Sequence, residues 1–278
     1  MNTILKRTLL SSLVLPFALG VQSASAGTLV TNWGYEVDST FTNFTASSGN
    51  GSVTASDANR KLSWGVPSAT YPNQSSISIT DVMAPSGLET NDTDSVTGGV
   101  FTHNNFIISN QDAALTSFDL TSALTLTPFA PAAGDSFVAA SITFASFFRE
   151  TSNNGNCVAA STSNCDDIFT VGNIGDLGAN PTGDGFEFAS SFNLDGYTYT
   201  VFLELIGLGV LDNDACLAAN APMGCVGFLT EENSVNTYQT QFRITGTEIP
   251  VPEPGTMALL GLGLAGLGLS RRKKAAKS

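Results

Sequence analysis

The amino-acid sequence predicts an all-β domain, a sandwich of the jelly-roll type, between two hydrophobic chain ends. Three observations lead to this prediction. Apolar residues alternate with polar ones over many short runs, and the segments between the runs are rich in Gly, Asn, Asp and Pro. No stretch outside the two ends keeps a long 3.6-residue period. About nine to eleven strands of this kind fit a sandwich, and a barrel is the alternative architecture.

The run at 136–148 places large apolar side chains on both faces of a strand, which is typical of a position in the middle of a sheet. The clearest hairpin covers 185–208, where Asp195-Gly196 suits a type I′ turn that needs φ > 0 at both central residues. Shorter strands are expected at 51–56, 61–65, 76–82, 117–127, 168–171 and 238–247, and short helices at 112–115 and 211–219. Trp33 and Trp64 are expected in the core, because large aromatic residues are mostly buried.

The domain between the chain ends, residues 27–249, is strongly acidic. It holds 4 of the 11 basic residues and all of the 24 acidic residues except Glu253, which gives it a net charge of −19. Such a domain repels the phosphates of nucleic acids and of anionic lipids, so both are excluded as partners held by charge. Its length is sufficient for one large hydrophobic core.

The four cysteines form two closely spaced pairs, Cys157 with Cys165 and Cys216 with Cys225. Each pair lies in a turn-rich segment, so we expect two local disulfides, formed in an oxidising compartment. A zinc site is disfavoured because the chain has one histidine and no Cys-x-x-Cys.

The N-terminal residues 1–26 have the pattern of a secretory signal peptide. Lys6 and Arg7 precede an apolar stretch at 9–21, and Ala24-Ser25-Ala26 supplies the small residues that signal peptidase requires. A permanent membrane anchor is the alternative, but the apolar stretch is too short to span a membrane.

The C-terminal residues 250–274 contain three consecutive parts. Val251, Pro252, Glu253 and Pro254 form a proline-rich motif, an uncharged glycine- and leucine-rich run follows at 255–270, and the basic cluster 271–274 ends the segment. We expect the run to form a single hydrophobic helix of about 24 Å, shorter than the bilayer core of about 30 Å, which suits a temporary anchor. The basic cluster would stay in the cytoplasm.

This order of parts resembles the PEP-CTERM signal of Gram-negative bacteria. The resemblance implies that the protein is exported, is held transiently in the inner membrane, and is processed by an exosortase. It further implies delivery to the cell surface or to the exopolysaccharide matrix.

A second short motif, Thr102-His103-Asn104-Asn105, resembles the signature of the THxN family of PEP-CTERM proteins. The resemblance marks Thr102, His103 and Asn105. In a loop, these side chains would either bind a ligand or form a hydrogen-bonded corner that fixes strand geometry. His103 is the only histidine and no Gly-x-Ser-x-Gly motif is present, so no catalytic residue is assigned.

Paired acidic residues raise the possibilities of a glycosidase and of a calcium site. Glu187 and Glu204 lie on the two strands of the expected hairpin, and Glu231 adjoins Glu232. A glycosidase would need two carboxyl groups roughly 5–9 Å apart, one of them with a raised pKa. Solvent-facing glutamates are the ordinary alternative.

Calcium requires six to eight hard oxygen ligands. Such oxygens occur in the Asp166-Asp167 pair and in two Asp-x-Asp segments, whose residues are the tentative calcium ligands Asp92, Asp94, Asp212 and Asp214. No EF-hand loop is present, and turn chemistry is the alternative explanation for these aspartates.

The sequence therefore predicts an exported, non-enzymatic binding or structural module, with calcium as the one possible cofactor. Expected partners are the signal peptidase and the exosortase, with exopolysaccharide or another surface protein as the ligand. A secreted carbohydrate-active enzyme that uses paired carboxylates is the alternative, and a purely structural matrix protein is a third.

Overall fold

The computed structural model describes residues 27–152, 157, 165–250 and 261–264. The expected signal peptide and the motif from Val251 to Pro254 lie outside these residues, as does most of the expected hydrophobic helix, of which residues 261–264 are helical. Within the described residues, no helix is long and apolar enough to cross a membrane. The chain divides into two units, and the larger one is Thr28–Thr247.

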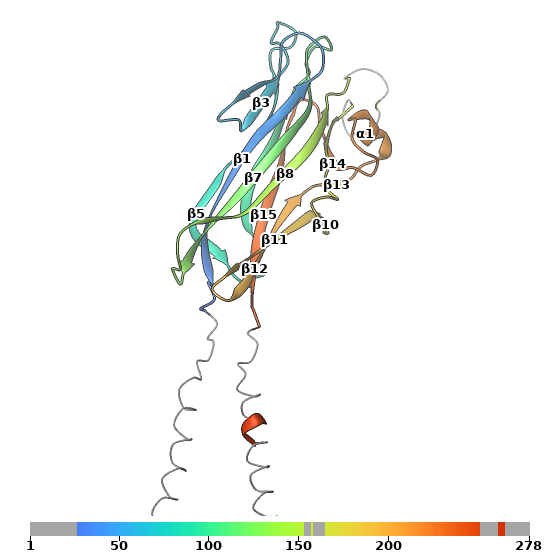
Figure 1. The fold of residues 1–278 in the computed structure, drawn as a ribbon. Helices are drawn as coiled ribbons and strands as arrows, with labels where there is room; N and C mark the ends of the chain where they lie inside the picture. Colours follow the sequence, from blue (N-terminus) through green and yellow to red (C-terminus); the bar gives the residue numbers. More distant parts are fainter. Residues whose placement is uncertain (1–26, 153–156, 158–164, 251–260, 265–278) are drawn as a thin grey trace, which may run out of the picture. The chain divides into compact units, whose positions relative to one another are not determined.

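This larger unit consists of two antiparallel β-sheets whose inner faces pack against each other, which confirms the prediction of an all-β sandwich (Figure 1). The first sheet has the strand order β13 (Gly209–Val210), β14 (Val226–Thr230), β9 (Asp167–Val171), β8 (Phe137–Arg149), β7 (Leu115–Ala130), β1 (Asn32–Ala46), β5 (Val82–Glu89). The second has the order β10 (Asn180–Pro181), β11 (Gly185–Leu194), β12 (Tyr197–Ile206), β15 (Ser234–Glu248), β6 (Val96–Asn105), β4 (Ser75–Ile79), β3 (Lys61–Trp64), β2 (Thr54–Ser56).

Several elements agree with the sequence analysis. Strand β8 lies in the middle of the first sheet, and β11 and β12 form the predicted hairpin, in which Asp195 and Gly196 have φ of 48° and 80°. The predicted helix at 211–219 is present as α1 (Asn213–Ala218).

The described residues contain fifteen strands, more than the nine to eleven expected. The strands that were missed carry Gly, Asn, Asp or Pro, which weaken the sequence signal for a strand; they are β1, β5, β6, β10, β13 and β14. Hydrogen bonds to neighbouring strands stabilise these segments, although their own residues have a low preference for β structure.

The predicted helix at 112–115 is wrong. Its backbone instead bonds to a distant segment: Ala113 N–H donates to Asn50 O over 2.9 Å, and Ser47 N–H donates to Ala114 O over 2.8 Å. These hydrogen bonds hold the residues that directly precede β7. They use the backbone groups that a helical turn would need for its own hydrogen bonds. Tertiary pairing has overridden a short local preference.

The core between the sheets has two clusters. One contains Trp64, Phe118, Phe148 and Phe188, and the other contains Trp33, Tyr199 and Phe242. Both tryptophans are fully buried, as predicted. The long strands β1 and β7 contribute side chains to both clusters, so one pair of strands connects the two halves of the core.

We predict that Gly227→Ala destabilises the domain by about 1–3 kcal/mol, the usual cost of forcing atoms into a packed site. A Cβ at Gly227 in β14 would lie 1.9 Å from the carbonyl oxygen of Phe169 in β9. Urea unfolding of the variant measures the change.

The matched control is Gly209→Ala, because Gly209 lies opposite Gly227 in the ladder and a Cβ there has no neighbour within 4 Å. This control should leave stability unchanged or raise it slightly. Equal effects of the two substitutions would contradict the argument.

Candidate functional site

The Thr-His-Asn motif lies in strand β6, between β15 and β4, and not in a loop as the sequence analysis expected. Strand alternation therefore divides the motif. His103 and Asn105 are buried at 1% and 0% exposure, whereas Thr102 and Asn104 alternate with them and are partly exposed. The motif is thus not one cluster: two of its side chains lie in the core and Thr102 does not join them.

His103 and Asn105 connect the second sheet to β14 of the first. The Nδ1 atom of His103 lies 2.9 Å from the Thr230 hydroxyl, and the Asn105 amide donates to Thr230 O over 3.1 Å. Trp64 stacks on the His103 ring at a centroid distance of 5.8 Å, and Phe148 meets it edge-on at 5.2 Å. The two buried side chains of the motif therefore connect the two sheets, and two aromatic rings pack against His103.

Burial lowers the pKa of His103 from 6.5 to about 3, because the imidazolium would lose its hydration. The ring is neutral at physiological pH. A general base needs access to its substrate and a pKa near the working pH, and His103 has neither.

Three carboxyl groups converge beside this motif. Glu150 follows β8, Asp167 begins β9, and Glu232 lies in the turn after β14. One oxygen from each lies within 4.8 Å of the other two. Asp167 has no exposed surface and Glu232 has 9%. Glu150 is partly exposed as a residue, but its carboxyl oxygen Oε1 is buried.

Protein hydrogen bonds hold this carboxylate cluster (Glu150, Asp167 and Glu232) in place. The indole N–H of Trp64 donates to Glu150 Oε2 over 2.8 Å, and the backbone N–H of Thr151 donates to Asp167 Oδ1 over 2.7 Å. Trp64 ends β3 in the second sheet, so its bond to Glu150 also crosses between the sheets. The carboxylate cluster and the Thr-His-Asn motif share this tryptophan.

The electrostatics of the cluster favour protonation unless a positive charge is supplied. Burial, followed by repulsion from Glu232, raises the pKa of Glu150 to about 8. Burial and then Glu150 raise the pKa of Asp167 well above its ordinary value, and burial raises that of Glu232 to about 7. Three ionised carboxylates at this distance repel one another strongly. The site can therefore hold protons or a multivalent cation.

The sequence marks two members of this cluster for separate reasons. Asp167 belongs to a candidate calcium pair and Glu232 to a candidate glycosidase pair, whereas Glu150 was not predicted. The available signal was that Glu150 directly follows a mid-sheet strand and that Asp167 begins another short apolar run. Only the pairing of β8 with β9 brings the two together.

The four tentative calcium ligands lie elsewhere. Asp92 and Asp94 are exposed between β5 and β6, where Asp92 Oδ1 accepts the backbone N–H of Asp94 over 3.3 Å. Asp212 and Asp214 are exposed at the start of α1. None of these aspartates joins a group of three acidic or histidine ligands within the described residues. Calcium binding by them stays a prediction.

The predicted glutamate pair on the hairpin is present but is engaged in other interactions. Glu187 and Glu204 face each other in the ladder between β11 and β12. Glu187 forms an ion pair with Arg243 at 2.9 Å, and Glu204 accepts hydrogen bonds from Thr182 and Gln241, both at 2.6 Å. These bonds lower the pKa of Glu204, with the Thr182 bond as the largest cause. Glu204 is thus not the acid of raised pKa that a glycosidase requires.

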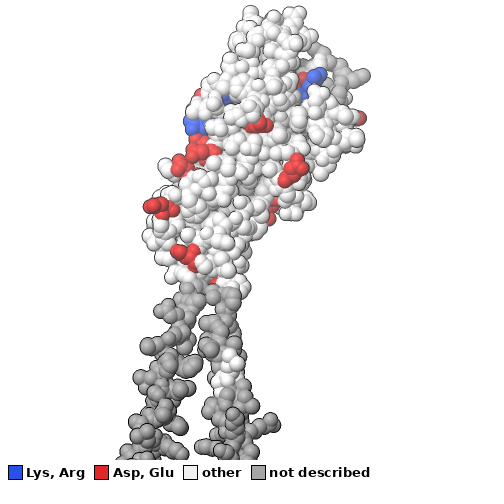
Figure 2. All heavy atoms as spheres, viewed as in Figure 1, with Lys and Arg blue, Asp and Glu red and all other residues white. Residues whose placement is uncertain are grey.

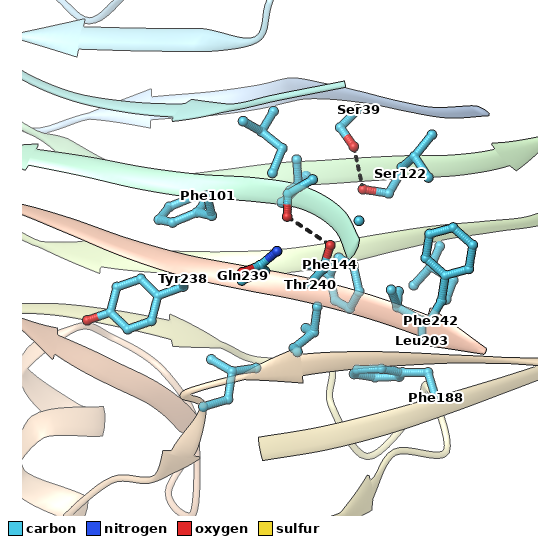
Figure 3. Close-up of a pocket in the computed structure, with 18 of the residues that line it drawn as sticks. Ser39, Phe101, Ser122, Phe144, Phe188, Leu203, Tyr238, Gln239, Thr240 and Phe242 are labelled. Carbon is cyan, nitrogen blue, oxygen red and sulfur yellow. Dashed lines mark hydrogen bonds between the residues drawn. The ribbon is translucent and has the colours of Figure 1, made fainter. Parts of the chain in front are cut away.

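A cavity of about 100 Å³ lies between the sheets (Figure 3). Its walls are almost entirely apolar, and the hydroxyl groups of Ser39 and Ser122 bond to each other at 2.8 Å. Thr240 bonds to the carbonyl of Gly99, so it too is satisfied. Among the described residues, no charged side chain lines the cavity. Its chemistry is that of a packing void, and the carboxylate cluster is the stronger functional candidate.

Both disulfides are local, as predicted: Cys157 pairs with Cys165 and Cys216 with Cys225. The first lies between Glu150 and Asp167 in the sequence, and the Thr151 hydroxyl donates to the carbonyl of Cys165. The second joins Cys216 in α1 to Cys225, which directly precedes β14. The first cross-link therefore constrains the segment that joins Glu150 to Asp167.

The comparisons identify the C-terminal segment. Residues 250–273 match the model of the PEP-CTERM protein-sorting motif, which confirms the sequence prediction of this signal. No curated protein and no solved structure matches the chain. The motif indicates an exported, surface-associated protein that an exosortase processes at the membrane. The larger unit of this exported protein is the β-sandwich described above.

We predict that His103→Asn changes the pH dependence of stability. Neutral His103 contributes stability that is fully present above pH 6.5 and is lost as the pH falls toward 3, since its folded pKa lies below its unfolded one. Asn keeps a hydrogen-bonding atom near the Nδ1 position and does not titrate. The wild-type advantage should shrink by up to about 1.4 kcal/mol per pH unit below 6.5.

Urea unfolding between pH 7.5 and 4.5 measures this difference. Glu150, Asp167 and Glu232 are present in both proteins, so their own titration cancels in the comparison to first order. Parallel stability curves for the two proteins would contradict the burial of a neutral imidazole.

Proposed function

We propose that this protein is a non-enzymatic module of the cell surface or exopolysaccharide matrix of a Gram-negative bacterium, released from the inner membrane by an exosortase. The sorting motif at residues 250–273 carries the proposal, because it accounts for export and processing together. We further assign the chain to the THxN group of such proteins, on the basis of Thr102, His103 and Asn105.

The catalytic candidates that the sequence offered have other roles. His103 is buried and neutral, Glu187 is paired with Arg243, and Glu204 has a lowered pKa. The polar core residues hold the sheets together, which suits a protein whose task is to persist outside the cell. These observations support a binding or structural role over hydrolysis.

The exterior supports a hydrated polysaccharide as the partner. Hydroxyl groups on neighbouring strands bond to each other at exposed positions, such as Thr121 with Thr143 at 2.9 Å and Ser191 with Thr200 at 2.8 Å. Charged groups are sparse on the face shown in Figure 2, and most of them are acidic. Such a surface hydrogen-bonds to sugar hydroxyls and does not attract anionic polymers by charge.

Processing is tested by mass spectrometry of protein released from the cell surface. We expect an N-terminus near Gly27 and no residues beyond the Val251–Pro254 motif. A strain without its exosortase should retain the longer form in the inner membrane. Full-length protein at the surface of the normal strain would contradict the proposal.

The absence of catalysis is tested with matrix polysaccharide purified from the producing cells. We expect the protein to co-sediment with the polymer and to release no reducing sugar. The double variant Glu187→Gln, Glu204→Gln should bind equally well. Release of sugar by the wild type that is lost in this variant would instead establish the carbohydrate-active enzyme.

A further inference from the structure

We propose that Glu150, Asp167 and Glu232 bind a calcium ion that holds the two sheets together at one end of the sandwich. The three carboxylates come from three separate places in the chain, after β8, at the start of β9, and in the turn from β14 to β15. Their oxygens lie within 4.8 Å of one another, close enough to coordinate one ion. This inference is independent of the ligand proposed above.

Two buried carboxylate oxygens of the cluster lack a hydrogen-bond partner within the described residues. Glu150 Oε1 and Asp167 Oδ2 are buried and have no hydrogen-bond partner among the described residues. Asp167 is completely buried, so water does not satisfy its second oxygen from the surface. A buried carboxylate oxygen without a partner is costly, and a cation between the three groups would satisfy these oxygens together.

The charges of Glu150 and Asp167 are not balanced by an ion pair within the described residues. The acidic residues in the ion pairs of this part of the chain are Asp57, Asp81 and Glu187. No lysine or arginine occurs in residues 150–232. Buried charges in proteins are paired or coordinate a metal, and here the first possibility is not met by the described basic residues.

The ligand type selects calcium. All three groups are carboxylates, whereas zinc prefers sulfur and nitrogen, and all four cysteines are in disulfides. Magnesium keeps several of its waters and demands a near-ideal octahedron, which a buried three-carboxylate site does not favour. Calcium accepts carboxylates in irregular geometry and takes its remaining ligands from carbonyl groups or water. Extracellular modules bind it at about 10⁻⁴–10⁻³ M.

The position of the cluster explains what the ion would do. Glu150 is bonded to Trp64 of the second sheet, and Glu232 lies in the turn that leads from the first sheet into β15 of the second. An ion bound by the carboxylate cluster would add a further connection between the sheets, beside those made by His103, Asn105 and Trp64. Calcium would therefore raise the stability of the whole sandwich.

Terbium luminescence tests the site, because Tb³⁺ replaces Ca²⁺ and emits when an excited tryptophan lies close to it. We expect tryptophan-sensitised emission from the full chain, competed away by Ca²⁺. Trp64→Phe should abolish it, whereas Trp33→Phe should preserve it, since Trp33 belongs to the other core cluster. Emission that survives Trp64→Phe, or none in the wild type, would overturn the assignment.

Calcium titration by calorimetry and thermal unfolding with CaCl₂ or EDTA gives the second test. We expect Glu232→Gln and Asp167→Asn to weaken binding at least about tenfold and to remove the calcium-dependent rise in Tm. Circular dichroism verifies that each variant is folded. Asp94→Asn and Asp214→Asn, in the exposed Asp-x-Asp segments, are the matched controls and should keep both effects.

The competing possibility is that shared protons alone hold the three carboxyl groups. In that case the wild type would show neither calorimetric binding of calcium nor a calcium-dependent Tm, and this result would overturn the proposal. Loss of both effects in the Asp94 or Asp214 control, with retention in Glu232→Gln, would move the site to the exposed aspartates and would overturn it equally.

Discussion

The contact between the two sheets at their polar end is the constraint on which the rest of this structure depends. Over most of the sandwich the sheets are joined by apolar packing, which is strong but not directional. At one end the interior contains His103, Asn105 and Asp167, all of them buried. Polar groups are buried at acceptable cost only when their partners are fixed, so this end specifies how the sheets must align.

Trp64 links the parts of this polar end. Its ring stacks on His103 and its indole N–H bonds to Glu150, so one side chain of β3 contacts both the Thr-His-Asn motif and the carboxylate cluster. The Cys157–Cys165 disulfide lies in the segment between Glu150 and Asp167. Restricting this segment in the unfolded chain favours the folded arrangement of these two acids.

The same arrangement gives structural partners to the residues that the sequence offered as catalytic candidates, which supports the proposed non-enzymatic role. A catalytic histidine must be accessible and near its working pKa, and the requirement of sheet alignment buries His103 and keeps it neutral. The hairpin glutamates are held by Arg243, Thr182 and Gln241, and the contacts of Arg243 and Gln241 connect β15 to the hairpin. Side chains that the sequence offers as catalytic candidates thus contact other strands and stabilise the fold. The sorting motif directs this protein to the cell surface.

The sequence alone predicted the sorting signal, the all-β class and the local disulfides. These features depend on residues close together in the chain, such as the motif before the glycine-rich run, the Asp195-Gly196 turn and the cysteine spacing. It also placed Trp33 and Trp64 in the core. Only the tertiary structure showed that Thr102 is separated from His103, that residues 112–115 are not helical, and that Glu150, Asp167 and Glu232 meet. Those outcomes depend on which strands pair and which faces are buried, and such long-range contacts leave no local signal in the chain.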